Sequence, residues 1–562
     1  MKRVSGLLAV LLLAACGNEA PPAQEPAAPV VKLSEDAAAI HSDRLAQHLR
    51  MLASDEFEGR APATPGEEKT VAYIAEQFAA AGLQPGGENG GWTQAVTLEK
   101  MVINGPVTAA FSLNGTRWEL VNGEDIALES LHPDSDIDLR ELPVVFAGYG
   151  ITAPELDWDD YAGLDVAGKL VVVLVNDPDF ETEPGRFGGR AMTWYGRWSY
   201  KYIEAAQRGA AGVLIVHETE PAAYPWATVR NGRGAPQFDI VREDAAAFHL
   251  PVRGWIQLAT AQRLFAEAGL DFDEAKRAAQ QHGFRAHAMQ GIGFSTAFEV
   301  ERSRIISRNV LGLLPGGAQA EETVIVSGHW DSFGIGDADE SGDAIINGAV
   351  DNATAIASMI EIARVMALGE APARSVLFIA LTAEESGLLG ATYYAANPLR
   401  PLATTAAVVN MEMWSPDGPT RDISSWGLGK VSLERDLAAA AKARGRGYSS
   451  DPNLEAGLFY RADHFAFAQA GVPAITVGPG MDQLDGGVEG GMAARAEYFA
   501  RHYHQPSDEF GDWWDMRGPT ADTDVVLQLV RDVANSVDWP AWDADSEFRA
   551  VRQASAAERG GH

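Results

Sequence analysis

Two glutamates stand side by side at the end of an apolar stretch. The segment FIALTAEE ends at Glu384 and Glu385. Two neighbouring carboxylates in a half-buried place repel each other, and this costs free energy unless a cation holds them. A helix N-terminus would also suit acidic residues, because the helix dipole is positive there. The choice between a cation site and a helix start depends on partners elsewhere in the chain.

Further acidic and histidine side chains follow apolar, strand-like segments in the second half of the sequence. In open α/β sheets, ligands bind beyond the carboxyl ends of the strands. Each residue alone is weak evidence: a His-x-Asp pair is more often structural, and an Asp before a helix is often only an N-cap. Their joint position at one edge of a sheet favours zinc or a similar divalent ion. The residues are His329, Asp331, Asp351, Glu412 and His504.

Five motifs in a fixed order resemble a known family. They read GHWD, VDNATA, AEES, NMEM and YHQPSDE. The sequence is similar to the two-zinc aminopeptidase family that includes glutamate carboxypeptidase and the transferrin receptor, over most of residues 45–513. This resemblance implies an α/β fold, with a mostly parallel central sheet sandwiched by helices. It also implies two Zn²⁺ ions, for which other divalent ions could substitute.

The resemblance assigns a metal-binding role to five residues. His329 and Glu412 would hold one ion, and Glu385 and His504 would hold the other. Asp351 would bridge both ions. The family usually has aspartate at the position of Glu412, and the extra methylene group still permits ligation.

The same resemblance separates the two adjacent glutamates. Neighbouring residues in an extended segment point to opposite sides, so Glu385 can bind metal while Glu384 faces the substrate water as general base. The nucleophile would be a hydroxide that bridges the two metals. Asp331 would orient the ring of His329. Tyr460 is the candidate donor to the oxyanion, and the alternative for Tyr460 is a buried packing role.

These residues predict a zinc-dependent exopeptidase, in the first place an aminopeptidase that removes N-terminal residues from peptides. A carboxypeptidase or dipeptidase on the same scaffold would need an arginine cluster for the substrate carboxylate, and no Arg-rich stretch marks one in the sequence. A glutaminyl cyclase is disfavoured by the complete two-metal ligand set. A catalytically inactive binding protein is disfavoured because all five ligands and the base have suitable chemistry.

The predicted elements that must position these side chains follow two different sequence patterns. From about residue 305, apolar strands alternate with helical patterns, which predicts a largely parallel sheet. Residues 34–82 predict two helices around a loop. The strand-rich region between them resembles an inserted protease-associated (PA) domain. We therefore expect a catalytic domain over 34–112 and 290–540, a PA domain region over 113–289 and a polar tail over 541–562.

The first residues, MKRVSGLLAVLLLAAC, have two basic residues and then an apolar run too short to span a membrane. The ending resembles the lipobox of bacterial lipoproteins. We therefore expect a signal peptide over 1–16, lipidation at Cys16 and a flexible tether over 17–33. Cys16 is the only cysteine, so disulfides are excluded. Gly17 after the cysteine favours anchoring in the outer membrane, facing the periplasm.

The composition limits the partners. The chain has 562 residues and a formal net charge of −34, which favours two domains and argues against nucleic acid or an anionic membrane surface as a partner. We expect a peptide substrate, and membrane attachment only through the N-terminal lipid. The sequence leaves the oligomeric state open.

Overall fold

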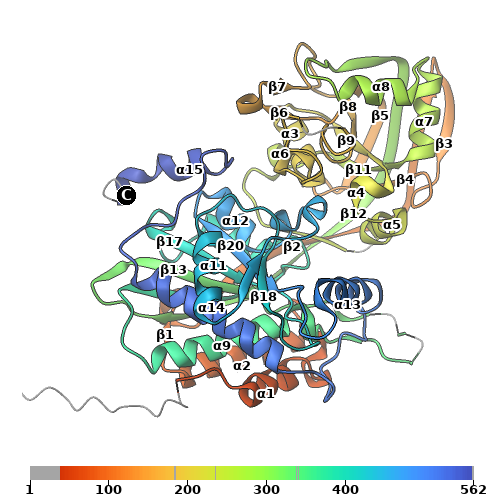
Figure 1. Cartoon of the computed structure of the whole chain (residues 1–562). Coiled ribbons are helices and arrows are strands. Elements are labelled where there is room, and N and C mark those ends of the chain that lie inside the picture. Colours follow the sequence, from red (N-terminus) through yellow and green to blue (C-terminus); the bar gives the residue numbers. More distant parts are fainter. Residues whose placement is uncertain (1–37, 183–184, 235, 337, 340, 560–562) are drawn as a thin grey trace, which may run out of the picture.

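The computed structural model describes residues 38–559, apart from 183–184, 235, 337 and 340. The predicted signal peptide, Cys16 and the tether lie outside these residues. Figure 1 shows two halves joined side by side, and one 16-stranded sheet runs through both of them. No helix in the described part of the chain is long and apolar enough to cross a membrane.

One half corresponds to the predicted catalytic domain, residues 34–112 and 290–540, and is called the catalytic half. The other corresponds to the predicted PA domain region, residues 113–289, and is called the inserted half. The catalytic half contains the predicted parallel strands. Their order is β20-β17-β13-β16, and each is parallel to its neighbour. β16 and β17 are buried throughout, β13 is buried from Thr323 to its end, and β20 is buried except for its last residue, as expected for apolar strands covered on both sides. Their bounds are β13 (Gln319–His329), β16 (Arg374–Leu381), β17 (Thr405–Met411) and β20 (Ala474–Pro479).

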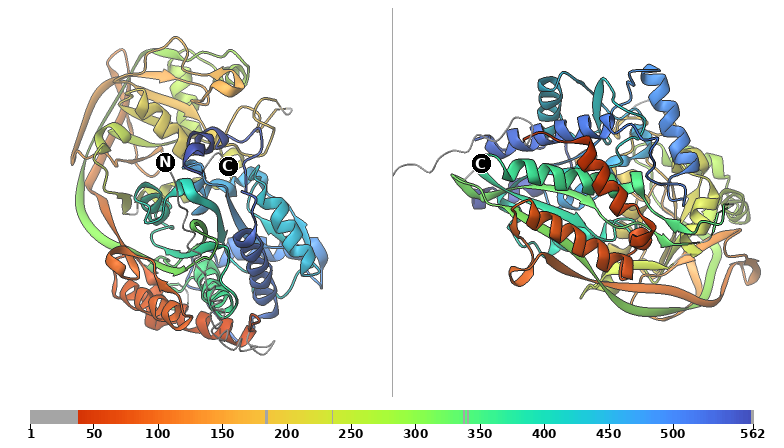
Figure 2. Two further views of the ribbon diagram at one scale, coloured as in Figure 1. Left: turned by 90° about the vertical axis from the view of Figure 1, so that its left-hand side faces the viewer. Right: turned by 90° about the horizontal axis from the view of Figure 1, so that it is seen from below.

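Helices cover this sheet in two groups (Figure 2). In the first group, α1, α2 and α14 pack against α9, which is buried along nearly its whole length. In the second group, α12 packs against β17 and β20, and α10 packs against α12. The predicted helices near the N-terminus and the closing amphipathic helix are confirmed as α1, α2 and α14. The bounds are α1 (Ser42–Leu52), α2 (Pro65–Ala80), α9 (Thr354–Ala367), α10 (Leu389–Ala396), α11 (Leu433–Ala443), α12 (His464–Gln469), α13 (Gly487–Arg501) and α14 (Arg517–Asn535).

Two long antiparallel strands connect the halves, β2 (Thr93–Leu113) and β12 (His287–Leu314). β12 pairs with β16 at one end and with β5 at the other. The predicted domain boundaries at 112/113 and 289/290 therefore lie within strands that belong to both halves. The other half has its own buried core and a parallel run, β5 (Asp136–Phe146), β8 (Leu170–Leu174), β9 (Gly212–His217) and β11 (Val252–Gln257), with β4 (Ile126–Glu129) at its edge.

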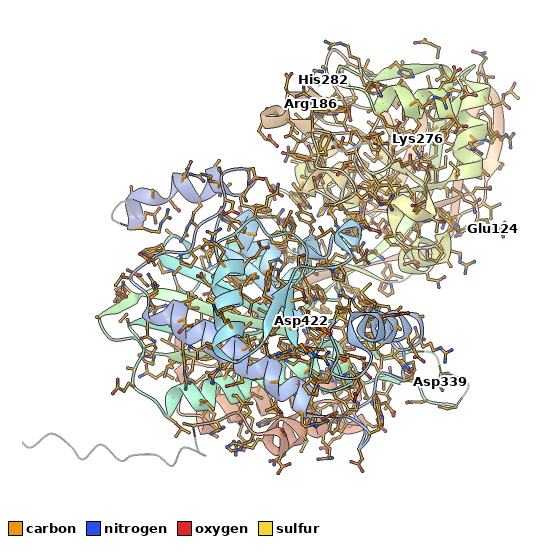
Figure 3. All side chains as sticks on the ribbon, viewed as in Figure 1. Glu124, Arg186, Lys276, His282, Asp339 and Asp422 are labelled. Atoms are coloured by element: carbon orange, nitrogen blue, oxygen red, sulfur yellow. The ribbon has the colours of Figure 1, made fainter. Side chains whose placement is uncertain are left out.

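Shorter elements complete both halves. In the inserted half, Lys276 (Figure 3) forms two ion pairs, with its Nζ 2.6 Å from Glu218 and 2.7 Å from Glu181. The shorter elements include β1 (Gln84–Pro85), β3 (Thr116–Leu120), β10 (Gln237–Ile240), β14 (Gly334–Ile335), β15 (Ile345–Ile346), β18 (Asp422–Ser425), β19 (Gly447–Ser449), α3 (Trp198–Gln207), α7 (Leu258–Glu267) and α8 (Phe272–Ala279).

The expectation of a loose polar tail is wrong for its described part. Trp542 and Phe548 are buried, and both rings pack against Phe459. A short helix, α15 (Arg549–Ala554), follows them. Two aromatic side chains in an otherwise polar segment are enough to dock it on the catalytic half.

Candidate metal centre

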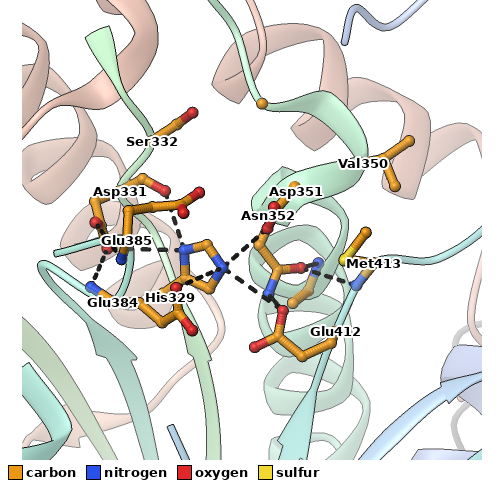
Figure 4. A network of polar contacts seen from close by, with 12 residues as sticks. His329, Asp331, Ser332, Val350, Asp351, Asn352, Glu384, Glu385, Glu412 and Met413 are labelled. Carbon is orange, nitrogen blue, oxygen red and sulfur yellow. Dashed lines mark hydrogen bonds and ion pairs between the residues drawn. The ribbon is translucent and has the colours of Figure 1, made fainter. Parts of the chain in front are cut away.

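The predicted residues meet at the carboxyl edge of the parallel strands. β13 ends at His329, while the glutamate pair and Glu412 follow β16 and β17 within a few residues. Asp351 lies in the turn before α9, and His504 lies in the loop after α13. Figure 4 shows the His329 ring between the loop of the glutamate pair and the side that carries Asp351 and Glu412.

Asp351 presents one carboxylate oxygen to each of two histidines. Its Oδ1 lies 3.1 Å from Nε2 of His329, and its Oδ2 lies 3.4 Å from Nε2 of His504. Glu412 Oε2 is 3.6 Å from His329, and Glu385 Oε2 is 3.2 Å from His504. Within each of these two groups the possible ligand atoms lie within 4.8 Å of one another. Two three-residue groups therefore share Asp351, and His329, Glu384 and Glu385 form a third possible group.

The donor atoms fit divalent cations better than they fit one another. Nε2 of His504 and Oε1 of Glu385 are buried and have no hydrogen-bond partner, although carboxylate oxygens lie close to the imidazole. Buried polar atoms are normally satisfied, and unpaired ones are costly. Imidazole nitrogens and carboxylate oxygens are suitable zinc ligands, so these residues can hold the metal that the sequence implies.

The charges in the cluster strongly perturb its pKa values. Burial disfavours the charged form of His329, but the carboxylates of Glu384 and Glu412 raise its pKa well above the usual range. Burial also opposes charge on His504, while Glu385 and Asp351 raise its pKa to about 10. Burial raises the pKa of Glu384, and the neighbouring Glu385 raises it further. Without a cation, the cluster therefore retains protons.

Asp331 fixes the glutamate pair rather than the histidine ring. Its carboxylate accepts the backbone N–H of Glu384 at 3.1 Å and that of Glu385 at 3.4 Å. Nδ1 of His329 instead lies 3.0 Å from the backbone carbonyl oxygen of Asp331, and 3.7 Å from its carboxylate. The sequence suggested that Asp331 orients the ring, and the structure shows that its main chain does so.

Two further polar residues hold the ligands, and the sequence analysis did not single them out. Asp508 accepts the backbone N–H groups of Val350 at 2.9 Å and of Asp351 at 3.1 Å. Asn352 donates from Nδ2 to Oε2 of Glu412 at 2.5 Å. Asn352 lies inside the motif VDNATA and Asp508 inside YHQPSDE. Their place in these motifs is the sequence feature that could have identified them.

Tyr460 does not turn toward the cluster. Its hydroxyl donates to Glu547 at 3.0 Å, and its ring lies 6.1 Å from that of Trp194. Tyr503 is the tyrosine beside the ligands, because its ring stacks on that of His504 with centroids 3.6 Å apart. Burial and the carboxylates of Asp351, Glu385 and Glu384 raise the pKa of Tyr503 well above its usual value. The sequence feature that could have pointed to Tyr503 is its position directly before His504.

A cavity of about 280 Å³ lies next to the cluster, between α13 and the ends of the strands. Two of its lining residues, Val350 and Met413, directly adjoin Asp351 and Glu412 in the chain. Its walls are mostly apolar and include Met481, Ala494, Tyr498 and Trp514.

Comparisons with known proteins agree with this geometry. Residues 309–530 match the model of peptidase family M28. This segment is less than half of the chain. The segment that is similar to this family contains all the candidate ligands.

Sequence relatives match over parts of this chain and of their own length. A probable zinc metalloprotease of Pyrenophora teres f. teres is 35% identical over 104 residues, which are 18% of this chain and 22% of that protein. The aminopeptidase NAALADL1 of Mus musculus is 32% identical over 113 residues, which are 19% of this chain and 14% of that protein. The chain thus spans about a fifth or less of the length of these relatives.

Among solved structures, an aminopeptidase from Aneurinibacillus sp. strain AM-1 superimposes with a TM-score of 0.51 at 20% identity. The match covers 90% of this chain and 96% of that one. It supports the expected α/β fold, a large mixed sheet flanked by helices.

Proposed function

We propose that this protein is a zinc-dependent exopeptidase that removes N-terminal residues from peptides. The observation that carries this proposal is the pair of ligand groups sharing Asp351 at the edge of the sheet. Glu384 lies within 4.0 Å of His329 and forms a third possible group with His329 and Glu385. We assign it to proton transfer, and not to a metal, because it lies outside the two groups that share Asp351 and because the sequence resemblance gives it that role.

Each residue has a chemical task in this proposal. When bound, two zinc ions would supply Lewis acidity and make a water molecule acidic near neutral pH. His329 and Glu412 would hold one ion, Glu385 and His504 the other, and Asp351 both. Their positions agree with the roles that the sequence resemblance implied.

Glu384 would accept the proton of the attacking water at a carboxylate oxygen and deliver it to the departing amine. Tyr503 replaces Tyr460 as the proposed donor to the developing oxyanion, because Tyr503 lies against His504 whereas the Tyr460 hydroxyl is engaged with Glu547. We also infer that the cavity next to Asp351 receives the side chain of the released residue.

The test is hydrolysis of short peptides and aminoacyl-anilides, with zinc, with chelator and with Glu384→Gln. Release of N-terminal residues that is abolished by chelator and lowered about 10²- to 10⁴-fold by Glu384→Gln, with zinc still bound, supports the proposal. Turnover that survives removal of both metals would refute it.

Two arginines favour a second candidate, a dipeptidase or carboxypeptidase on the same scaffold. Arg197 is buried and Arg461 is half-buried, and each has a guanidinium nitrogen that is buried without a hydrogen bond. Arg197 and Arg461 come from different halves, so no Arg-rich stretch of sequence reveals them. Guanidinium groups bind carboxylates. Peptides with a blocked N-terminus distinguish the candidates, because an aminopeptidase leaves them intact.

The location of the protein is a separate proposal. The lipobox-like ending at Cys16 supports a lipid anchor in the outer membrane, with the peptidase facing the periplasm. Assignment of the inserted half to the PA domains likewise rests on its sequence resemblance. Substitution of Cys16 by serine should abolish labelling by a radioactive fatty acid in a Gram-negative host and release the protein from the membrane fraction.

A further inference from the structure

A strained turn near the N-terminus carries a fully buried arginine. Arg60 is 1% exposed and ends the short turn Asp55–Arg60. Glu58, Gly59 and Arg60 all have positive φ values, of +52°, +65° and +52°. Residues with a Cβ adopt this conformation only at a cost in free energy, so the contacts around the turn must offset the cost.

The Arg60 side chain joins three separate stretches of backbone. Its Nε donates to the carbonyl oxygen of Trp330 at 2.8 Å, and its Nη2 donates to that of Gly348 at 2.9 Å. Its Nη1 donates to the carbonyl oxygens of Asn347 at 2.5 Å and of Leu52 at 2.7 Å. The planar fork of a guanidinium group can reach several fixed acceptors at once, which the compact ammonium group of lysine cannot do.

Two of these acceptors flank proposed metal ligands. Trp330 directly follows His329, and Gly348 lies three residues before Asp351. The chain between these acceptors contains the paired strands β14 and β15, called here the ligand hairpin. Arg60 therefore closes the ligand hairpin at its base. His329 and Asp351 belong to the same group of possible ligand atoms, so their separation depends on this closure.

The turn before Arg60 fits closely against the ligand hairpin. A Cβ on Gly59 would lie 2.6 Å from the carbonyl oxygens of Gly334 in β14 and Ile346 in β15. Gly348 has a φ of +54°, and a Cβ there would lie 2.9 Å from Nη2 of Arg60. Glycine at these positions permits the close approach of backbone and guanidinium group. The turn and the ligand hairpin are thus complementary in shape.

The ligand hairpin also reaches a third proposed ligand. The ring of Phe333, directly before β14, packs on the imidazole of His504 with centroids 4.3 Å apart. Tyr503 stacks on the same imidazole. His504 has a φ of +59°, so its own backbone is strained and its orientation depends on such contacts. A shift of the ligand hairpin would therefore move a side chain that supports His504.

Arg60 also places a positive charge near the carboxylates of the metal centre. Burial lowers the pKa of Arg60 to about 10, and the carboxylates of Asp508, Asp331 and Asp351 act against this shift. The guanidinium group is therefore charged at neutral pH. A fixed cation favours the ionised form of nearby carboxylates, which is the form that binds metal.

We propose that Arg60 is a positioning residue of the metal centre, which sets the separation of His329 and Asp351 by closing the ligand hairpin between them. This inference rests on the proposed peptidase function and deepens it, because it names the group that holds two ligands in register. Arg60 touches neither metal nor substrate in this role. The fork of the guanidinium group is the decisive feature, and the positive charge alone is not sufficient.

The test measures the zinc affinity of the full-length protein with Arg60→Lys and with Arg60→Gln, by competition with a fluorescent chelator. We expect the dissociation constant of zinc to rise about 10- to 100-fold in both variants, the usual loss when the support of a metal ligand is removed. The visible absorption spectrum of the cobalt-loaded variants should also differ from that of the wild-type protein, because it reports ligand geometry. Wild-type affinity and spectrum in either variant overturn the inference.

Arg374→Lys is the matched control. Arg374 is also fully buried and also donates to a backbone carbonyl oxygen, that of Val533 at 2.8 Å. It lies at the first residue of β16, whereas the glutamate pair follows the other end of this strand. Arg374→Lys should lower the free energy of unfolding and leave zinc affinity unchanged. An equal loss of zinc affinity in this control would show that general destabilisation is the cause, and it would overturn the inference.

A measurement on the wild-type protein decides the matter if the Arg60 variants do not fold. Because coupling is reciprocal, a contact that strengthens zinc binding is itself strengthened by zinc. Hydrogen exchange of the backbone amides in the turn Asp55–Arg60 should therefore become about 10-fold faster or more when zinc is removed. Exchange that does not respond to zinc overturns the inference.

These measurements need no substrate, so they separate failure of the inference from failure of the proposed function. If the Arg60 variants lose zinc affinity and the wild-type protein cleaves no peptide, the positioning role stands and the peptidase function falls. If the wild-type protein cleaves peptides and Arg60→Lys keeps the wild-type affinity and spectrum, the peptidase function stands and the positioning role is refuted.

Discussion

At the scale of single residues, the metal centre depends on groups that hold its ligands. Asp508 accepts two successive backbone N–H groups, those of Val350 and Asp351, and also the hydroxyl of Tyr498 at 3.0 Å. These bonds set the direction in which the Asp351 carboxylate points. Burial raises the pKa of Asp508 to about 7, so it forms this support at the cost of its own solvation.

Asp508→Asn should therefore weaken metal binding. An amide has one acceptor oxygen, and its NH₂ group would face a backbone donor, so the turn that carries Asp351 would shift. We expect zinc affinity to fall about 10- to 100-fold, with kcat largely recovered at saturating zinc. Competition with a fluorescent chelator measures the affinity. Asp512→Asn is the control, since Asp512 is fully exposed and should leave zinc affinity unchanged. An unaltered affinity in Asp508→Asn would show that Asp351 needs no such support.

Zinc binding should release protons at neutral pH. In the metal-free cluster the pKa of His504 is about 10 and that of His329 is also raised, so both imidazoles carry protons that a metal must displace. Zinc affinity should fall as the pH decreases from 8 to 6. Calorimetry at pH 7 in buffers of different ionisation enthalpy counts the released protons. Proton-neutral binding would contradict the electrostatics of the cluster.

The same shifts have a consequence for the metal-free protein. A histidine pKa that is higher in the folded state stabilises that state below the unfolded value of 6.5, and this contribution is lost as the pH rises to about 10. The free energy of unfolding of the metal-free protein should therefore decline from pH 6.5 to 10. Urea titrations along this range measure it, with the zinc-loaded protein as the comparison.

At the scale of elements, the sequence predicted best what a single segment encodes. Strand ends and their polar residues are local patterns, so His329, Glu385 and Glu412 could be assigned to one edge of the sheet. Tyr460 could not be placed, because its orientation depends on Glu547 and Trp194, which are far away in sequence. Arg197 and Arg461 were not predicted for the same reason, because they are far apart in sequence and belong to different halves.

The cavity beside α13 gives a prediction about specificity. Ala494 lines the cavity, so Ala494→Phe should fill part of its 280 Å³. We expect kcat/KM for leucyl substrates to fall by about tenfold or more, and that for alanyl substrates to change much less. Ala493→Phe is the matched control, because Ala493 is exposed on the same helix and does not line the cavity. An equal loss for both substrates would show that the cavity does not receive the side chain.

At the scale of the whole molecule, the two halves share a sheet but keep separate cores. The change of style along the sequence was enough to expect two parts, because composition and periodicity differ between them. The long strands β2 and β12 were not apparent as single elements, since their pairing across both halves is a property of the folded chain. The docking of the final segment through Trp542 and Phe548 was likewise invisible in a polar stretch.

Trp194 is one of the side chains that join these cores. It packs against the apolar clusters of both halves, and its ring contacts Tyr460 and Phe465 across the boundary. Trp194→Ala removes these contacts, and each half keeps its own core. We therefore expect the inserted half to move relative to the metal centre, with a larger radius of gyration in small-angle X-ray scattering and an increased KM. Zinc content should remain that of the wild-type protein, because no proposed ligand contacts Trp194.

The matched control is Trp513→Ala. Trp513 is 68% exposed and lies in the catalytic half, beside the cavity and away from the boundary between the halves. Its loss should leave the radius of gyration unchanged, even if it alters binding. If Trp194→Ala keeps the compact shape, then β2, β12 and the remaining contacts, such as that of β10 with α10, are enough to hold the halves in place. Arg197 would in that case be positioned by the sheet rather than by the aromatic contact.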